Sequence, residues 1–80
     1  MRGRPKSAID LYIIAKAKEL RTEFGYSQAV LAVKLGVSDA FIGQIENPKN
    51  TSKYSSEQIN KLAQIFNCSP RDFWPEKPLL

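Results

Sequence analysis

Apolar residues recur at helical spacing in several consecutive stretches, which predicts a chain built from helices. The first stretch predicts a long helix from Ser7 to Phe24, with Gly25 as its C-terminal stop. Its apolar stripe consists of Ile9, Ile13, Ala17, Leu20 and Phe24. Three further apolar residues lie off this stripe and either pack under the C-terminal segment or stay exposed; they are Leu11, Tyr12 and Ile14.

The next stretch predicts two short helices joined by a tight turn. Ser27 can cap a helix of about residues 28–35, and Ser38 can cap a second helix of about residues 38–46. Gly36 lies between them, where a turn requires a residue that tolerates a positive φ. The inward apolar positions of the two helices are Leu31, Ala32, Leu35, Ile42 and Ile45. Together these features define a helix-turn-helix unit.

The C-terminal part of the chain predicts one more helix and a short helical turn. A capping box starts a helix at Ser55. The core-facing residues of this helix are Ile59, Leu62, Ala63 and Phe66. Ser69, followed by proline, starts the short turn, and residues 75–80 are expected to be extended. The predicted fold is therefore all-α, with four to five helices in one compact domain over residues 7–74.

Charge is concentrated at the N-terminus. The chain has 80 residues and a formal net charge of +4. Arg2, Arg4 and Lys6 lie within the first six residues, which contain no acid, so residues 7–80 carry nine basic and eight acidic residues. A flexible basic arm over residues 1–6 indicates nucleic acid or an anionic surface as partner, and a solubilising tail is the alternative.

The arm also contains the tetrapeptide R-G-R-P, which resembles the core of an AT-hook. That resemblance implies arginines lying in a narrow A·T-rich minor groove, where the negative potential is high. Loose contact with phosphates is an equally weighted alternative.

Several functional classes lack their usual residues. The chain has no histidine and a single cysteine, Cys68, so histidine-based catalysis, histidine metal ligands and an internal disulfide are excluded. No apolar run has the length of a membrane span or a signal-peptide core. No nucleophile–base pair, carboxylate cluster or phosphate loop is apparent. We therefore expect a non-enzyme without cofactor, metal, membrane or small-molecule ligand, located in the cytoplasm with the nucleoid.

The central motif carries a family resemblance. S-Q-x-x-L-A-x-x-L-G-V-S, followed by I-x-x-I-E-N, resembles the lambda-repressor/Cro-type (XRE) helix-turn-helix family over roughly residues 9–74. The resemblance implies a lambda-repressor-like domain that regulates transcription by binding double-stranded DNA. It also implies a structural ion pair between Arg21 and Glu46, in which the planar guanidinium holds the carboxylate with two hydrogen bonds.

The second helix of the motif is the one expected to read bases. With Ile42 toward the core, a turn of about 100° per residue places Ala40, Gly43 and Gln44 outward and Asp39 on the flank. Gln44 can pair with adenine, Ala40 can contact a thymine methyl group, and Asp39 can accept from cytosine. The expected phosphate or groove contacts are Arg2, Arg4, Lys6, Gln28, Lys34, Ser38, Asn47, Lys49, Asn50 and Lys53.

A domain of this size reads only a few base pairs, so a homodimer on a palindromic operator is expected. The candidate dimer contacts are Phe73, Trp74, Leu79 and Leu80, and the alternative for Phe73 and Trp74 is that they close the core. One feature opposes DNA reading: the helix of about residues 38–46 has no arginine or lysine, and Asp39 is repelled by phosphates. The alternative is a protein-interaction module, such as an antitoxin or phage accessory protein, in which Ala40 and Phe41 contact a protein.

Overall fold

The computed structural model describes residues 4–80, and these residues fold as predicted into helices only. The elements are α1 (Ala8–Glu23), α2 (Gln28–Leu35), α3 (Asp39–Glu46), α4 (Ser56–Ile65) and the 3-10 helix η1 (Pro70–Phe73). The predicted contact of Arg2 with DNA lies outside the described residues. No helix in the described part of the chain is long and apolar enough to cross a membrane.

Every helix begins at a serine. In each case the serine hydroxyl accepts a hydrogen bond from a backbone N–H of the first turn, and the residues are Ser7, Ser27, Ser38, Ser55 and Ser69. At α1, α4 and η1 the third helical residue also accepts from the N–H of the serine, which completes a capping box. These local signals explain why the helix starts were readable from the sequence.

The turn between α2 and α3 is closed by Gly36. This glycine has φ +81°, in the left-handed region, and its N–H donates to the carbonyl of Ala32 at 2.8 Å. The N–H of Val37 donates to the same carbonyl at 3.0 Å. A residue with a β-carbon is strained at this φ, so glycine makes the tight connection possible.

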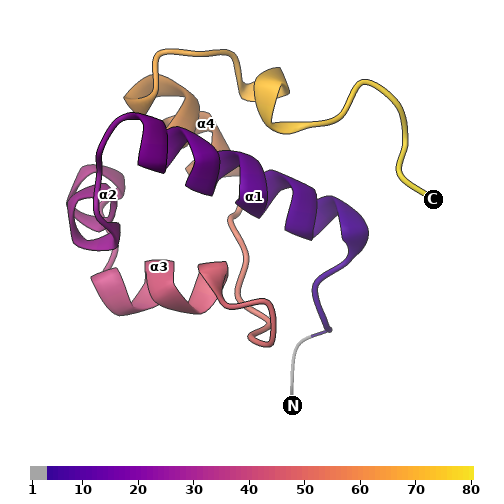
Figure 1. The fold of residues 1–80 in the computed structure, drawn as a ribbon, viewed down its shortest axis with the longest axis horizontal. Coiled ribbons are helices and arrows are strands. Elements are labelled where there is room, and N and C mark those ends of the chain that lie inside the picture. Colours follow the sequence, from indigo (N-terminus) through magenta and orange to yellow (C-terminus); the bar gives the residue numbers. More distant parts are fainter. Residues whose placement is uncertain (1–3) are drawn as a thin grey trace.

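The core fills the space enclosed by the four α-helices and η1 (Figure 1). Its buried residues are Ile13, Ile14, Ala17, Leu31, Ala32, Leu35, Ile42, Ile45, Tyr54, Ile59, Leu62, Ala63, Phe66 and Phe73. In Figure 1, α1 runs across the domain, α2 lies at the end where α1 finishes, and α3 lies on the side facing away from η1 and the C-terminal segment. Within the α2–turn–α3 unit, α3 packs against α1 and α2 packs against α4.

Ile14, for which packing and exposure were both left open, is buried. Two positions differ from the sequence prediction. Phe24 was placed on the apolar stripe of the first helix, but it is 44% exposed, because α1 ends at Glu23 and its ring packs edge-on against Phe66 instead. Phe73 was a candidate dimer contact, and that prediction is wrong: η1 folds back onto the core and leaves Phe73 with 0% exposure.

Candidate nucleic-acid interface

The face of α3 that the sequence assigned to base reading is open to solvent. Asp39, Ala40 and Gln44 are exposed and Gly43 is half-buried. On the opposite side of the same helix, Ile42 and Ile45 are fully buried. The four candidate reading positions therefore share one outward surface on a helix that is fixed by its inner side chains.

The N-terminal end of α3 is tightly specified. The hydroxyl of Ser38 accepts from the N–H of Phe41 at 3.1 Å, and the carboxylate of Asp39 accepts from the N–H of Ala40 at 3.0 Å. A carboxylate here interacts favourably with the positive end of the helix dipole. Asp39 thus has a local stabilising role besides the base contact expected from the sequence.

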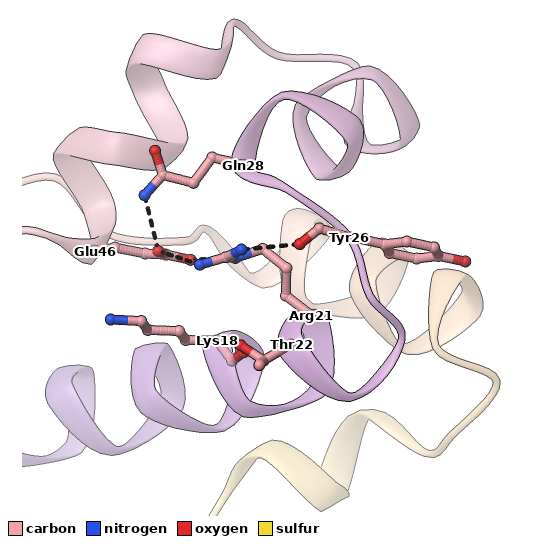
Figure 2. A network of polar contacts seen from close by, with 6 residues as sticks. All are labelled: Lys18, Arg21, Thr22, Tyr26, Gln28 and Glu46. Atoms are coloured by element: carbon pink, nitrogen blue, oxygen red, sulfur yellow. Dashed lines mark hydrogen bonds and ion pairs between the residues drawn. The ribbon is translucent and has the colours of Figure 1, made fainter.

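The C-terminal end of α3 is joined to α1 by the predicted ion pair (Figure 2). Arg21 Nε donates to Glu46 Oε2 and Arg21 Nη2 donates to Glu46 Oε1, both at 2.9 Å. Arg21 Nη1 donates to the carbonyl of Tyr26 at 2.8 Å. The side chains are only 13% and 5% exposed, so this is a largely buried, bidentate pair. It fixes α3 relative to α1 and to the segment that leads into α2.

Gln28, expected at a phosphate, extends this network (Figure 2). Its Nε2 donates to Glu46 Oε1 at 3.0 Å. A β-carbon on Gly43 would lie 3.4 Å from the Gln28 Oε1 atom, so the glutamine side chain lies beside this glycine. Gln28 therefore connects the first turn of α2 to α3 while remaining exposed.

Tyr54, to which the sequence reading gave no role, packs behind this network. Its ring is buried, and within residues 4–80 its hydroxyl has no hydrogen-bond partner. Burial raises the pKa of Tyr54 above its usual range, and the carboxylate of Glu46 raises it further. The phenol therefore stays neutral beside the Arg21–Glu46 pair. No local spacing pattern indicates this position, because its burial depends on how the loop after α3 folds back.

The basic residues near the end of α3 have different surroundings. Lys6 Nζ donates to the carbonyls of Asn47 and Gln44, at the C-terminus of α3. Partial burial lowers the pKa of Lys6, and Asp10 acts in the opposite direction. Lys53 Nζ lies 3.3 Å from Asp10 Oδ2. Lys49 is exposed.

Asp10 holds several of these groups together. Its Oδ2 accepts from the N–H of Ser7 at 3.0 Å and from Lys53. The hydrogen bond from the Ser7 N–H is the main cause of a lowered pKa for Asp10, and Lys53 contributes in the same direction against the effect of burial. The start of α1 and the loop after α3 are thereby connected, which the sequence reading did not predict.

The remaining candidate phosphate contacts are spread over the domain. The side-chain oxygens of Asn47 and Asn50 accept from the N–H groups of Lys49 and Ser52, so both asparagines shape the loop. Lys34 lies 4.9 Å from the ring centroid of Tyr26, at the end of α2. The structure therefore brings Lys6, Lys49 and Lys53 to the C-terminal side of α3 and leaves Lys34 apart from them. Arg4 is exposed.

Three of the four candidate dimer contacts remain on the surface. Trp74 and Leu79 are 42% and 43% exposed, and Leu80 is fully exposed. Trp74 and Leu79 share a shallow groove with Ile9 of α1. They are thus available to a partner, in contrast to Phe73.

Comparison with known proteins identifies the class. The helix-turn-helix family model HTH_3 matches residues 18–73, and the chain therefore belongs to this family, which is of the predicted XRE type. No curated protein sequence matches the chain.

Solved structures show the same fold. The restriction-modification controller protein C.AhdI from Aeromonas hydrophila is 29% identical, with a TM-score of 0.71 over 85% of this chain and 100% of that chain. SinR, the master regulator for biofilm formation, solved in complex with DNA, is 30% identical, with a TM-score of 0.65 over 76% of this chain and 95% of that one. An HTH_3 family transcriptional regulator from Vibrio cholerae is 31% identical, with a TM-score of 0.68 over 81% of this chain but only 35% of that chain.

Proposed function

We propose that this protein is a sequence-specific DNA-binding transcription regulator that places α3 in the major groove of an operator. The observation that carries the proposal is the exposed outer face of α3, opposite the fully buried Ile42 and Ile45. A helix held in this way can enter the groove with its polar side chains toward the base edges. Membership of the HTH_3 family and the DNA complex of the similar SinR support the same function.

Base reading is assigned to four residues of α3. The Gln44 amide can donate to and accept from an adenine in the major groove, and Ala40 can contact a thymine methyl group. Asp39 can accept from a cytosine amino group. Gly43 lets the helix backbone approach the bases, because it presents no side chain. A well-formed bidentate pair such as Gln44 with adenine discriminates by about 1–3 kcal/mol against the wrong base.

Phosphate binding by basic side chains must come from outside α3, since this helix contains no lysine or arginine. The sources are the arm, the loop after α3 and the N-termini of α2 and α3, where free N–H groups and the helix dipole attract anions. The assigned residues are Arg2, Arg4, Gln28, Lys34, Ser38, Asn47, Lys49, Asn50 and Lys53. Each phosphate neutralised by a lysine or arginine adds about 0.9 to the slope of log affinity against log salt. Binding is therefore strongly salt-dependent.

The functional unit is a homodimer on a palindromic operator, because a single domain of this kind reads few base pairs. Trp74, Leu79 and Leu80 supply exposed apolar surface for the contact between protomers. Regulation then follows from operator occupancy, by excluding or contacting the polymerase, and the protein acts in the cytoplasm where the DNA lies.

A second candidate is a protein-interaction module, favoured by the outer face of α2. Val30 and Val33 are 41% and 81% exposed on this helix. β-branched residues have lower helix propensity than alanine or lysine, so local stability does not explain two exposed valines here. If this candidate is correct, Val33→Lys abolishes partner binding and leaves DNA binding unchanged.

The test is selection from a randomised duplex pool at low and moderate salt, followed by sequencing. We expect a palindromic motif, with Gln44→Ala relaxing one position in each half-site. The matched control is Gln64→Ala, which truncates an exposed glutamine on α4 and leaves the motif intact. Enrichment of A·T-rich DNA without a motif would show that the arm dominates. Absence of enrichment at both salt concentrations rejects the operator-binding function.

A further inference from the structure

Within residues 4–80, Lys6 is the one basic residue that donates to the C-terminal carbonyl groups of α3. The last carbonyl groups of a helix lack intrahelical N–H partners and form the negative end of the helix dipole. The last turn of α3 contains no basic residue. Lys6, 41 positions away from Asn47 in sequence, donates to the carbonyl of Asn47, and it lies 3.4 Å from that of Gln44. Among residues 4–80 it is this lysine that caps the helix proposed to read DNA.

The neighbouring cations do not have this role. Lys53 faces the carboxylate of Asp10, and both Lys49 and Arg4 are exposed. Lys6 is half-buried, and this burial lowers its pKa. Two of the three N–H donors of this ammonium already have backbone acceptors, so it is held at the end of the helix and is less free than an exposed lysine to reach a phosphate.

The chain before Lys6 has a restricted conformation. Pro5 has a fixed φ, and a residue that precedes proline, here Arg4, is driven toward extended geometry. Two residues span at most about 7 Å, so Arg4 is confined to the neighbourhood of the α3 C-terminus. With α3 in the major groove, as proposed above, Arg4 is therefore close to the DNA that flanks the bases read by this helix.

We propose that Lys6 is a positioning residue that fastens the chain before α1 to the C-terminus of α3, so that Arg4 contacts the DNA flanking the base pairs read by this helix. The inference rests on the proposed function and revises one part of the sequence prediction, since Lys6 itself then binds no phosphate. Flanking contacts become fixed in register with the core of the operator, and the arm contributes to specificity as well as affinity.

A double-mutant cycle with the full chain tests this role. The duplex selected by the wild-type protein is titrated at several salt concentrations with Lys6→Ala, Arg4→Ala and the double variant. In the wild-type background we expect Lys6→Ala to weaken binding and to reduce the preference for particular base pairs that flank the core of the operator. In the Arg4→Ala background it has no further effect, because Lys6 acts through Arg4. Melting of each free variant verifies that the domain is folded.

The matched control is Lys49→Ala, which removes one exposed lysine from the same end of α3. The loss of affinity caused by Lys49→Ala is expected to be the same with and without Arg4. If Lys49 neutralises one phosphate, the slope of log affinity against log salt concentration decreases in magnitude by about 0.9. If Lys6→Ala behaves in this additive way, Lys6 is a phosphate contact and the proposed role is wrong. If it has no effect in either background, Lys6 is only a helix cap and the role is also wrong.

The proposed function and the role of Lys6 are rejected by different outcomes. If the wild-type protein selects no duplex, the proposed function fails, and the positioning role fails with it. If it selects a motif but the cycle shows no coupling between Lys6 and Arg4, only the role of Lys6 is rejected.

Discussion

Arg21 and Glu46 join the last turn of α1 to the last turn of α3 through two hydrogen bonds of 2.9 Å. Because Gln28 donates to the same carboxylate, Glu46 fixes α1, α2 and α3 at one point. The angle at which α3 leaves the domain depends on this point. A carboxylate that contacts no DNA in our proposal is therefore expected to affect DNA binding through the orientation of the helix.

Glu46→Ala is expected to lower the free energy of unfolding by about 2–4 kcal/mol, because it leaves the guanidinium of Arg21 largely buried and unpaired. The measurement is urea denaturation of the wild type and the variant. Arg21→Lys keeps the charge but loses the planar fork, so we expect an intermediate loss. A loss for Glu46→Ala no greater than that of the exposed Lys49→Ala contradicts the structural importance of the pair.

Gly43→Ala is expected to stabilise the fold and weaken DNA binding. The new β-carbon meets only the side-chain oxygen of Gln28, at 3.4 Å, and alanine favours a helix over glycine by about 0.5–1 kcal/mol. On DNA the same methyl group holds the backbone away from the bases. Thermal melting and titration with the selected duplex measure the two effects. Unchanged affinity shows that Gly43 is not needed for close approach.

Gly25→Ala is the matched control for that substitution. Gly25 has φ +71°, where a β-carbon is strained, so alanine is expected to destabilise the protein by about 1–2 kcal/mol. The opposite signs at the two glycines distinguish backbone strain from helix propensity.

Asp10 is expected to make stability fall in acid. Its pKa is lowered in the folded state, so its contribution is complete above the ordinary carboxylate value of 3.8 and disappears as pH falls through the folded value. Urea denaturation from neutral pH to about pH 2 measures the dependence. In Asp10→Asn the free energy of unfolding is expected to fall less steeply as the pH is lowered into the acid range. The control is Glu19→Gln, which removes an exposed carboxylate from the same helix. Coincident curves for the two variants reject the role of Asp10.

Tyr54→Phe is expected to leave the free energy of unfolding unchanged or to raise it by about 1 kcal/mol. A buried hydroxyl without a partner costs desolvation energy that phenylalanine does not. Tyr54→Ala is the comparison, and its cavity is expected to cost about 3–5 kcal/mol. If Tyr54→Phe destabilises the protein by more than 1 kcal/mol, the hydroxyl has an acceptor in solution.

Trp74→Ala is expected to shift the protein toward monomer in sedimentation experiments and to weaken binding to a palindrome more than to a half-site. Truncation of an exposed anchor removes apolar contact area from the interface between protomers. Val33→Ala truncates a more exposed apolar side chain on α2 and is the control. Should Val33→Ala dissociate the dimer and Trp74→Ala leave it intact, the interface lies on α2.

Much of the fold was predictable because its signals are local. Serine caps, Gly25, Gly36 and the apolar spacing gave the bounds of α1, α2 and α3 to within about one residue. The ion pair of Arg21 and Glu46 came from the family resemblance, since nothing in the spacing of residues 25 apart requires it. The exposure of Ala40 and Gln44 on α3 followed from placing Ile42 toward the core.

The unpredicted contacts all depend on tertiary packing. Position near the chain end left Phe73 open between closing the core and covering an interface, and the turn of η1 directs it into the core. The contacts of Lys6 with the α3 C-terminus and of Lys53 with Asp10 join residues about 40 positions apart. Charge alone identified these lysines as basic surface groups, and only the folded chain shows which of them already have acceptors.

The serine caps have an evolutionary consequence. Ser38 caps the start of α3, and Ile42 and Ile45 anchor this helix in the core. Ala40 and Gln44 neither cap the helix nor pack into the core. Exposed substitutions away from caps and cores usually change stability by less than about 0.5 kcal/mol. A lineage carrying this scaffold can therefore exchange its reading residues one at a time without passing through unfolded intermediates. New target sequences become accessible by drift at a few codons.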